Sequence, residues 1–178
     1  MTYIMITVFL KRCNTFSQEI YNKFIDSIAL NILRCPSCRH SGSFTVHGYY
    51  YRKLKVCGTI IRLRILRVKC SVCGCTHAIL PSLIVPYSQI DYHDTKAICE
   101  HFESGSGYED IMSENQCIDE SNIAYILKNY RRHWRELIRS WKMKVSDDIL
   151  QACFDHVHLQ FMQIKRTINT LIRVNHIT

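Results

Sequence analysis

The chain has 178 residues, of which 47% are hydrophobic and 21% are charged, and its formal net charge is +8. This balance excludes an intrinsically disordered chain, and the length suits one ordinary domain or two small ones. No apolar run approaches the ~20 residues that span a bilayer, so no membrane partner is predicted. The apolar start is followed by Lys11 and Arg12 rather than by a cleavage site for secretion. We therefore expect a cytoplasmic protein whose ten cysteines are reduced.

The charges are divided into blocks along the chain. Residues 34–69 contain nine Lys or Arg and no Asp or Glu, whereas residues 91–127 contain nine acids and one Lys. Residues 128–144 are basic again, with seven Lys or Arg and one Glu. Two basic blocks of this kind predict surfaces where a polyanion binds.

The N-terminal third begins with a β-branched, apolar run at residues 3–10, which predicts a buried strand. Thr15 followed by Gln18 resembles a capping box, and apolar residues then recur every four positions from 16 to 32. This spacing predicts one amphipathic helix that leads directly into Cys35.

The region after Cys38 is predicted to form strands. Residues 43–52 are a first candidate, and Gly58 marks a turn. Residues 61–65 alternate between apolar and basic side chains, and the alternation slips at Leu66, which predicts a β-bulge. Residues 76–90 contain Pro81 and Pro86, so we expect a loosely packed linker there.

Helical periodicity begins after Asp91. The pattern predicts helices over 93–103, 108–112 and 122–130, the last capped by Asp119 or Ser121 and continuing into the second basic block. Three short helices of this spacing match a helix-turn-helix, although a generic helical bundle shows the same pattern. A further amphipathic helix is predicted after Ser146.

Two Cys-x-x-Cys pairs provide the most specific signal in the chain. Cys35 and Cys38 form the first pair, and Cys70 and Cys73 form the second. Four thiolates brought together by a small sheet make a closed tetrahedral site, which is typical of structural Zn²⁺ and leaves no position for a substrate. Several further residues are candidate spare ligands that we expect to be bystanders: Cys75, His77, His40 and His47.

The basic blocks supply the candidate nucleic-acid contacts. The first block offers Arg and Lys side chains for phosphate together with an aromatic residue for stacking: Tyr50, Arg52, Lys53, Lys55, Arg62, Arg64, Arg67 and Lys69. The third helix offers groove-facing and backbone-facing residues: Ser121, Asn122, Tyr125, Lys128, Arg131 and Arg132. The alternative is that one or more of the tyrosines at 49–51 fill the small core, and that the charged helix face is only solvated.

The motifs also resemble a known group. The resemblance is carried by five segments: the first Cys pair, the His-Gly-Tyr-Tyr-Tyr-Arg segment at 47–52, the basic strand at 61–69, the second Cys pair and the Pro-containing segment at 80–87. Through them the chain resembles bacterial zinc-ribbon plus helix-turn-helix proteins of unassigned function, which are related to insertion-sequence transposases. The resemblance covers about residues 30–135 and implies recognition of element DNA. The chain departs from it at Arg39, where glycine often follows the second cysteine.

Together these signals predict an α+β protein with three parts. Residues 1–90 would be a zinc-ribbon domain with an N-terminal strand and helix, residues 91–145 an all-α helix-turn-helix-like domain, and residues 146–178 a C-terminal helix and tail. Asp147, Asp148 and Asp155 are the only acids after Glu136, and no strand pattern surrounds them, so we expect no catalytic core and no small-molecule substrate.

The predicted function is binding of double-stranded DNA, with a homodimer as one candidate state. The alternatives are a zinc-stabilised protein-interaction module, a truncated transposase remnant and a degenerate nuclease.

Overall fold

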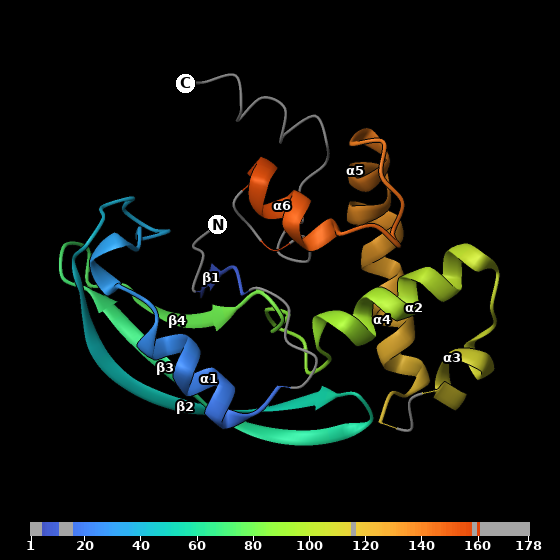
Figure 1. Ribbon diagram of the computed structural model, residues 1–178, viewed down its shortest axis with the longest axis horizontal. Helices are drawn as coiled ribbons and strands as arrows, with labels where there is room; N and C mark the ends of the chain where they lie inside the picture. Colours follow the sequence, from blue (N-terminus) through green and yellow to red (C-terminus); the bar gives the residue numbers. More distant parts are fainter. Residues whose placement is uncertain (1–4, 11–15, 115–116, 158–159, 161–178) are drawn as a thin grey trace.

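A computed structural model describes residues 5–10, 16–114, 117–157 and 160. The fold is mixed α+β: a four-stranded sheet, one α-helix and a 3₁₀-helix (Leu30–Ile32) precede a group of helices (Figure 1). None of the helices in these described ranges is long and apolar enough to cross a membrane.

The sheet has the order β1-β4-β3-β2. Strand β1 (Met5–Val8) pairs in parallel with β4 (Thr76–Pro81), and β4 pairs antiparallel with β3 (Thr59–Cys70), which pairs antiparallel with β2 (Phe44–Val56). Strand β4 is therefore internal, and from position 77 onward all of its residues are buried.

The long β2–β3 hairpin closes through a two-residue turn. Cys57 and Gly58 have φ values of 46° and 75°, and Val56 pairs with Thr59 on either side of them. Two consecutive positive φ values define a type I′ turn, whose twist matches that of the flanking strands. Figure 1 shows the hairpin as a curved ribbon whose tip reaches the helices that follow the sheet.

The predicted bulge at Leu66 is misplaced. The register shift lies in β2, between Val46 and Gly48, whereas β3 pairs continuously. The slip in the pattern arises because β3 is buried first on one face, through Leu63 and Ile65, and then on the other, through Leu66 and Val68.

Helix α1 (Gln18–Asp26) covers the part of β3 that β4 does not reach. Its N-cap is Ser17, whose side chain accepts from Ile20 N–H, and the predicted cap Thr15 lies outside the described residues. The helix is much shorter than predicted. The Gln18 amide bonds both backbone groups of Arg64, with 2.7 Å to the N–H and 3.3 Å to the carbonyl. The Tyr21 hydroxyl accepts from Leu66 N–H and donates to the Ile79 carbonyl, each at 2.9 Å.

The predicted linker at 76–90 is wrong. Its first six residues form β4, and Ile79 and Leu80 are fully buried. The partner that buries this strand, β1, lies about 70 positions upstream, so no local pattern could reveal the pairing. Pro81 is the last residue of the strand, where a missing N–H costs least.

Three helices follow the sheet near the predicted positions. Helix α2 (Tyr92–Ser104) starts at the N-cap Asp91 and ends at Gly105, whose φ is 88°. Helix α3 (Tyr108–Glu114) follows, and α4 (Glu120–Asn129) begins at Asp119, whose side chain accepts from Asn122 N–H.

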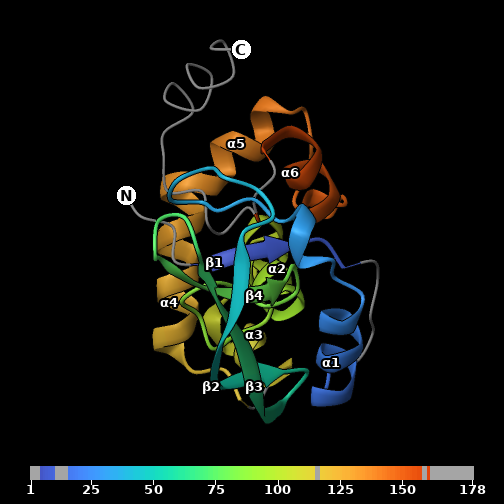
Figure 2. The same ribbon diagram turned by 90° about the vertical axis from the view of Figure 1, so that its left-hand side faces the viewer.

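The second basic block continues the third helix, as predicted. A π-helical turn (Tyr130–Trp134) joins α4 to α5 (Arg135–Ser140), and α6 (Ile149–Val157) comes last. Figure 2 shows α5 and α6 at the opposite end of the molecule from the hairpin tip. Phe154 of α6 packs edge-on against Phe9, with ring centroids 5.5 Å apart, so the last helix contacts the segment that follows β1.

Candidate metal centre and basic surface

The two Cys pairs have the same backbone geometry. Arg39 N–H donates to the Cys35 carbonyl at 2.8 Å, and Gly74 N–H donates to the Cys70 carbonyl at 2.9 Å. In return, Cys35 N–H donates to His40 and Cys70 N–H to Cys75, at 2.8 and 2.9 Å. Each turn requires a left-handed residue after its second cysteine, and Arg39 and Gly74 have φ values of 64° and 72°.

The turns bring all four sulfurs together, as predicted. The Sγ atoms of Cys35, Cys38, Cys70 and Cys73 lie within 4.8 Å of one another. Two Sγ–Sγ distances across the turns, Cys35 to Cys73 and Cys38 to Cys70, are both 3.7 Å. A disulfide would need about 2.05 Å, whereas a tetrahedral metal with bonds of about 2.3 Å to sulfur needs edges of about 3.8 Å. The cluster could therefore hold a metal ion.

The surrounding amides favour a thiolate at Cys70. The backbone N–H of Cys73, followed by that of Val72, lowers the pKa of the Cys70 thiol to about 7. At Cys73 the backbone N–H of Cys75 lowers the pKa of the thiol. Desolvation and the neighbouring thiols outweigh this effect and raise the pKa to about 12. Four close sulfurs cannot all be thiolates without a cation, so the donor set fits a divalent metal.

A histidine lies beside the cluster. The Nε2 atom of His77 is 3.3 Å from the Cys35 Sγ, and both residues are almost completely buried. The Phe44 ring contacts the imidazole edge-on, with centroids 6.1 Å apart. His77 thus neighbours the four-sulfur group as a hydrogen-bond partner, a role that the sequence analysis missed because the alternation of β4 is hidden by its burial on both faces.

Residues 35–121 match the model for a domain of unknown function (DUF6431). The match begins at the first cysteine of the cluster and ends in the first turn of α4, so it includes the hairpin and the four sulfurs. No curated protein and no solved structure gives a significant match to the chain.

The matched segment also carries an exposed basic surface on the hairpin. Arg62 stacks on the Tyr51 ring at 4.1 Å and Arg64 stacks on the Tyr49 ring at 3.8 Å, measured from the guanidinium carbon to the ring centroid. These four residues and Lys53 are exposed on one face of β2 and β3, and we name this face the outer hairpin surface. It contains three of the predicted phosphate contacts.

The opposite face of the hairpin holds two other predicted contacts. Tyr50 is half-buried against the core. Arg52 donates to the carbonyls of Val85 and Ser88, and burial lowers the pKa of its guanidinium. The alternation of β2 therefore separates Tyr50 and Arg52 from the outer hairpin surface.

The remaining hairpin candidates differ in their surroundings. The Lys55 Nζ atom bonds Asn122 Oδ1 at 2.7 Å and lies 3.5 Å from Asp119, so it joins the hairpin tip to the start of α4. Arg67 donates to Thr76 Oγ1 at 3.2 Å, and Lys69 is exposed.

The candidates on α4 and in the π-helical turn that follows it remain largely accessible. Tyr125 is 50% exposed, and Lys128 and Arg132 are also exposed. Asn122 is occupied by Lys55, Ser121 donates to the capping carboxylate of Asp119, and the guanidinium of Arg131 lies 4.4 Å from the centre of the Phe102 ring. The hairpin tip thus covers one side of the first turn of α4.

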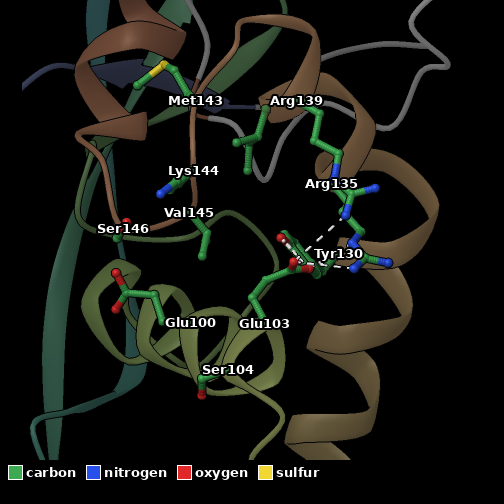
Figure 3. Close-up of a pocket in the computed structure, with 11 residues that line it drawn as sticks. Glu100, Glu103, Ser104, Tyr130, Arg135, Arg139, Met143, Lys144, Val145 and Ser146 are labelled. Carbon is green, nitrogen blue, oxygen red and sulfur yellow. Dashed lines mark hydrogen bonds and ion pairs between the residues drawn. The ribbon is translucent and has the colours of Figure 1, made fainter.

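Part of the second basic block faces an acid. Glu103 accepts from Tyr130 at 3.0 Å and pairs with Arg135 at 2.7 Å, and Arg139 lies 3.9 Å away (Figure 3). These residues line a cavity of about 470 Å³ between α2 and α5. Arg135 and Arg139 therefore join α5 to α2, whereas Lys128, Arg131 and Arg132 are exposed.

Proposed function

We propose that this chain is a zinc-stabilised protein that binds double-stranded DNA and has no catalytic domain of its own. The observation that carries the proposal is the outer hairpin surface, where two arginines are stacked on two exposed tyrosines. It lies within a stretch, residues 34–69, that contains nine basic residues and no acid.

The stacking suits phosphate binding. A guanidinium that lies flat on a ring is held in one orientation, and its N–H groups point along the ring plane toward solvent. The arginines cover one side of each tyrosine ring, which favours phosphate contact over extensive base stacking. A two-stranded ribbon is also narrow enough to enter the major groove of DNA.

The metal would provide the scaffold. Zn²⁺ bound by Cys35, Cys38, Cys70 and Cys73 would be a closed ribbon-type site, and it would fasten the base of the hairpin to the segment before β2. In this proposal the ion supplies folding energy and performs no chemistry.

Helix α4 would add the base contacts of a helix-turn-helix. Ser121 and Tyr125 would face the major groove, while Lys128 and Arg132 would approach the backbone. Because the hairpin tip covers part of the first turn of α4, we propose that the two elements bind DNA as one rigid unit.

The relation to transposases also remains a proposal. Three acids near the C-terminus have capping or local roles: Asp147 accepts from Lys144 N–H, Asp148 from Gln151 N–H, and Asp155 from the Gln151 amide. These roles support a DNA-binding part without its own nuclease centre.

The test is a titration of zinc-loaded protein with random-sequence duplex DNA at two salt concentrations. Replacing Arg62 and Arg64 with Ala should weaken binding at least about tenfold and flatten its salt dependence, because each lost phosphate contact reduces the slope by about 0.9. Replacement of both by Lys keeps the charge and should restore only part of the affinity. Unchanged affinity of the Ala variant, with an unchanged circular dichroism spectrum, would remove this surface from the interface.

A protein-interaction module is the second candidate. It is favoured by exposed apolar side chains in and near the cysteine turns: Ile32 is 73% exposed, Val46 59% and Val72 56%. The same titration separates the two functions, since a protein-binding module should show no steep loss of DNA affinity with salt.

A further inference from the structure

A groove runs between α1 and the outer hairpin surface, and duplex binding does not account for it. Its volume is about 570 Å³, within the range of about 300–1,000 Å³ that is usual for ligand sites. Residues from both walls line it: Gln18, Tyr21, Asn22, Ile25, Asp26, Tyr49, Tyr51, Arg62, Arg64 and Leu66.

The polar groups of the α1 wall are not equally available. The Gln18 amide is engaged by the Arg64 backbone and by Asn22, and the Tyr21 hydroxyl is engaged by Leu66 and Ile79. Asn22 and Asp26 are exposed. The Asn22 Oδ1 accepts from the Gln18 amide, so the Asn22 NH2 group and the Asp26 carboxylate are the groups that can bond a ligand from this side.

The other parts of the groove have different chemistry. Leu66 is buried and Ile25 half-buried, so they offer apolar surface at the base of the groove. The opposite wall carries the Arg62–Tyr51 and Arg64–Tyr49 stacks. The groove thus combines a cationic wall, an apolar base and a hydrogen-bonding wall.

A nucleotide has these three complementary parts: a phosphate, the face of a base, and a base edge with donors and acceptors. We propose that the groove binds unpaired nucleotides of a DNA strand beside the duplex that the outer hairpin surface holds. This inference rests on the proposed function. Asp26 would accept from an exocyclic amino group, as carboxylates do from cytosine N4.

An unpaired strand fits better than duplex. A paired base of a duplex must be unstacked and extruded before it can enter the groove, whereas the bases of an overhang are already unpaired. Helix α1 also walls the groove on one side, which leaves access for one strand while the duplex lies against the exposed hairpin.

The experiment compares the affinity for a blunt duplex with that for the same duplex carrying a short single-stranded overhang. We expect the overhang to bind about tenfold tighter, which corresponds to about 1.4 kcal/mol for the added nucleotide contacts. Asn22→Trp would fill the groove and bring the affinity ratio close to one, with blunt-duplex binding retained. Lys23→Trp is the matched control, because Lys23 is exposed on the same helix outside the groove, and it should keep the ratio.

The outcomes separate the two proposals. Equal affinity of the wild-type protein for both DNAs would overturn the groove inference and leave duplex binding intact, whereas no binding to either would overturn the proposed function. Should Asn22→Trp fail to fold, Asp26→Ala provides the second variant. It should abolish a preference for cytosine over thymine in the overhang, and wild-type protein without that preference would contradict the assigned role of Asp26.

Discussion

At the scale of single residues, the metal centre contains a conformational cost at Arg39. A non-glycine residue in the left-handed region costs about 1–2 kcal/mol, and Arg39 has a φ of 64°. Its counterpart Gly74 adopts the same conformation, and a Cβ added there would meet no atom within 4 Å. The two turns therefore allow backbone strain to be measured without steric interference.

We predict opposite effects of two substitutions. Arg39→Gly should raise the free energy of unfolding by about 0.5–1 kcal/mol, because relief of strain exceeds the entropy that glycine adds to the unfolded chain. Gly74→Ala should lower it by about 1 kcal/mol. Urea unfolding of the metal-loaded protein measures both, and a destabilised Arg39→Gly variant would show that the Arg39 side chain contributes more than the strain costs.

His77 should tune the metal site through the hydrogen bond to Cys35. A neutral donor beside a thiolate offsets its charge, and loss of such a partner typically costs 10–100-fold in metal affinity. We expect His77→Ala to weaken zinc binding by about this factor in competition with a chromophoric chelator, and His77→Gln to recover part of it. His47→Ala, at an exposed position near the β2 register shift, should have no effect.

At the scale of elements, the start of α2 contains a buried acid. Asp91 is 4% exposed, its Oδ1 accepts from Asp94 N–H at 2.8 Å, and burial raises its pKa from 3.8 to about 7. Its protonated form is therefore favoured by folding. The contribution of Asp91 to stability is fully present below about pH 4 and is lost as the pH rises through about 7.

Asp91→Asn should remove this pH dependence. Asparagine caps a helix as well as aspartate, so the cap is retained while the buried charge is lost. The variant should gain stability over wild type at pH 8 relative to pH 5, by at most about 3 kcal/mol, because about two pKa units separate pH 5 from the pKa of about 7. Urea unfolding at both pH values measures the difference, and an equal effect at the two would show that Asp91 titrates normally.

At the scale of the whole molecule, the metal centre joins the segments that flank the β2–β3 hairpin at the end opposite its tip. The sulfurs come from the turn before β2 and the turn after β3, where Phe44 pairs with Cys70. A small sheet with one helix buries a limited core, so the metal should supply a large share of the folding energy of the N-terminal half.

Replacement of Cys35 or Cys73 by Ser should therefore unfold the N-terminal half. Cys57→Ser, at the exposed hairpin tip, is the control and should leave the melting temperature unchanged. Thermal unfolding followed by circular dichroism, with and without a strong chelator, measures the effect. Near-native melting of the cluster variants would argue against a structural metal.

The sequence alone determined the features that depend on local spacing. The two Cys-x-x-Cys turns, the alternation of β3, the turn at Gly58 and the order of α2, α3 and α4 all follow from short-range patterns, and the structure confirms them. Backbone turns, periodicity and caps are set by residues within a few positions of one another, so they can be read from sequence.

Only the tertiary structure decided which side chains share a surface. The strand identity of residues 76–81 depends on pairing with distant β1, and the burial of β3 changes face at Leu66, whose N–H donates to the Tyr21 hydroxyl of α1. Arg52 and Arg62 look alike in sequence, yet one bonds buried carbonyls and the other stacks on an exposed tyrosine. Such differences arise from long-range packing, because a side chain's environment depends on elements far away in the chain.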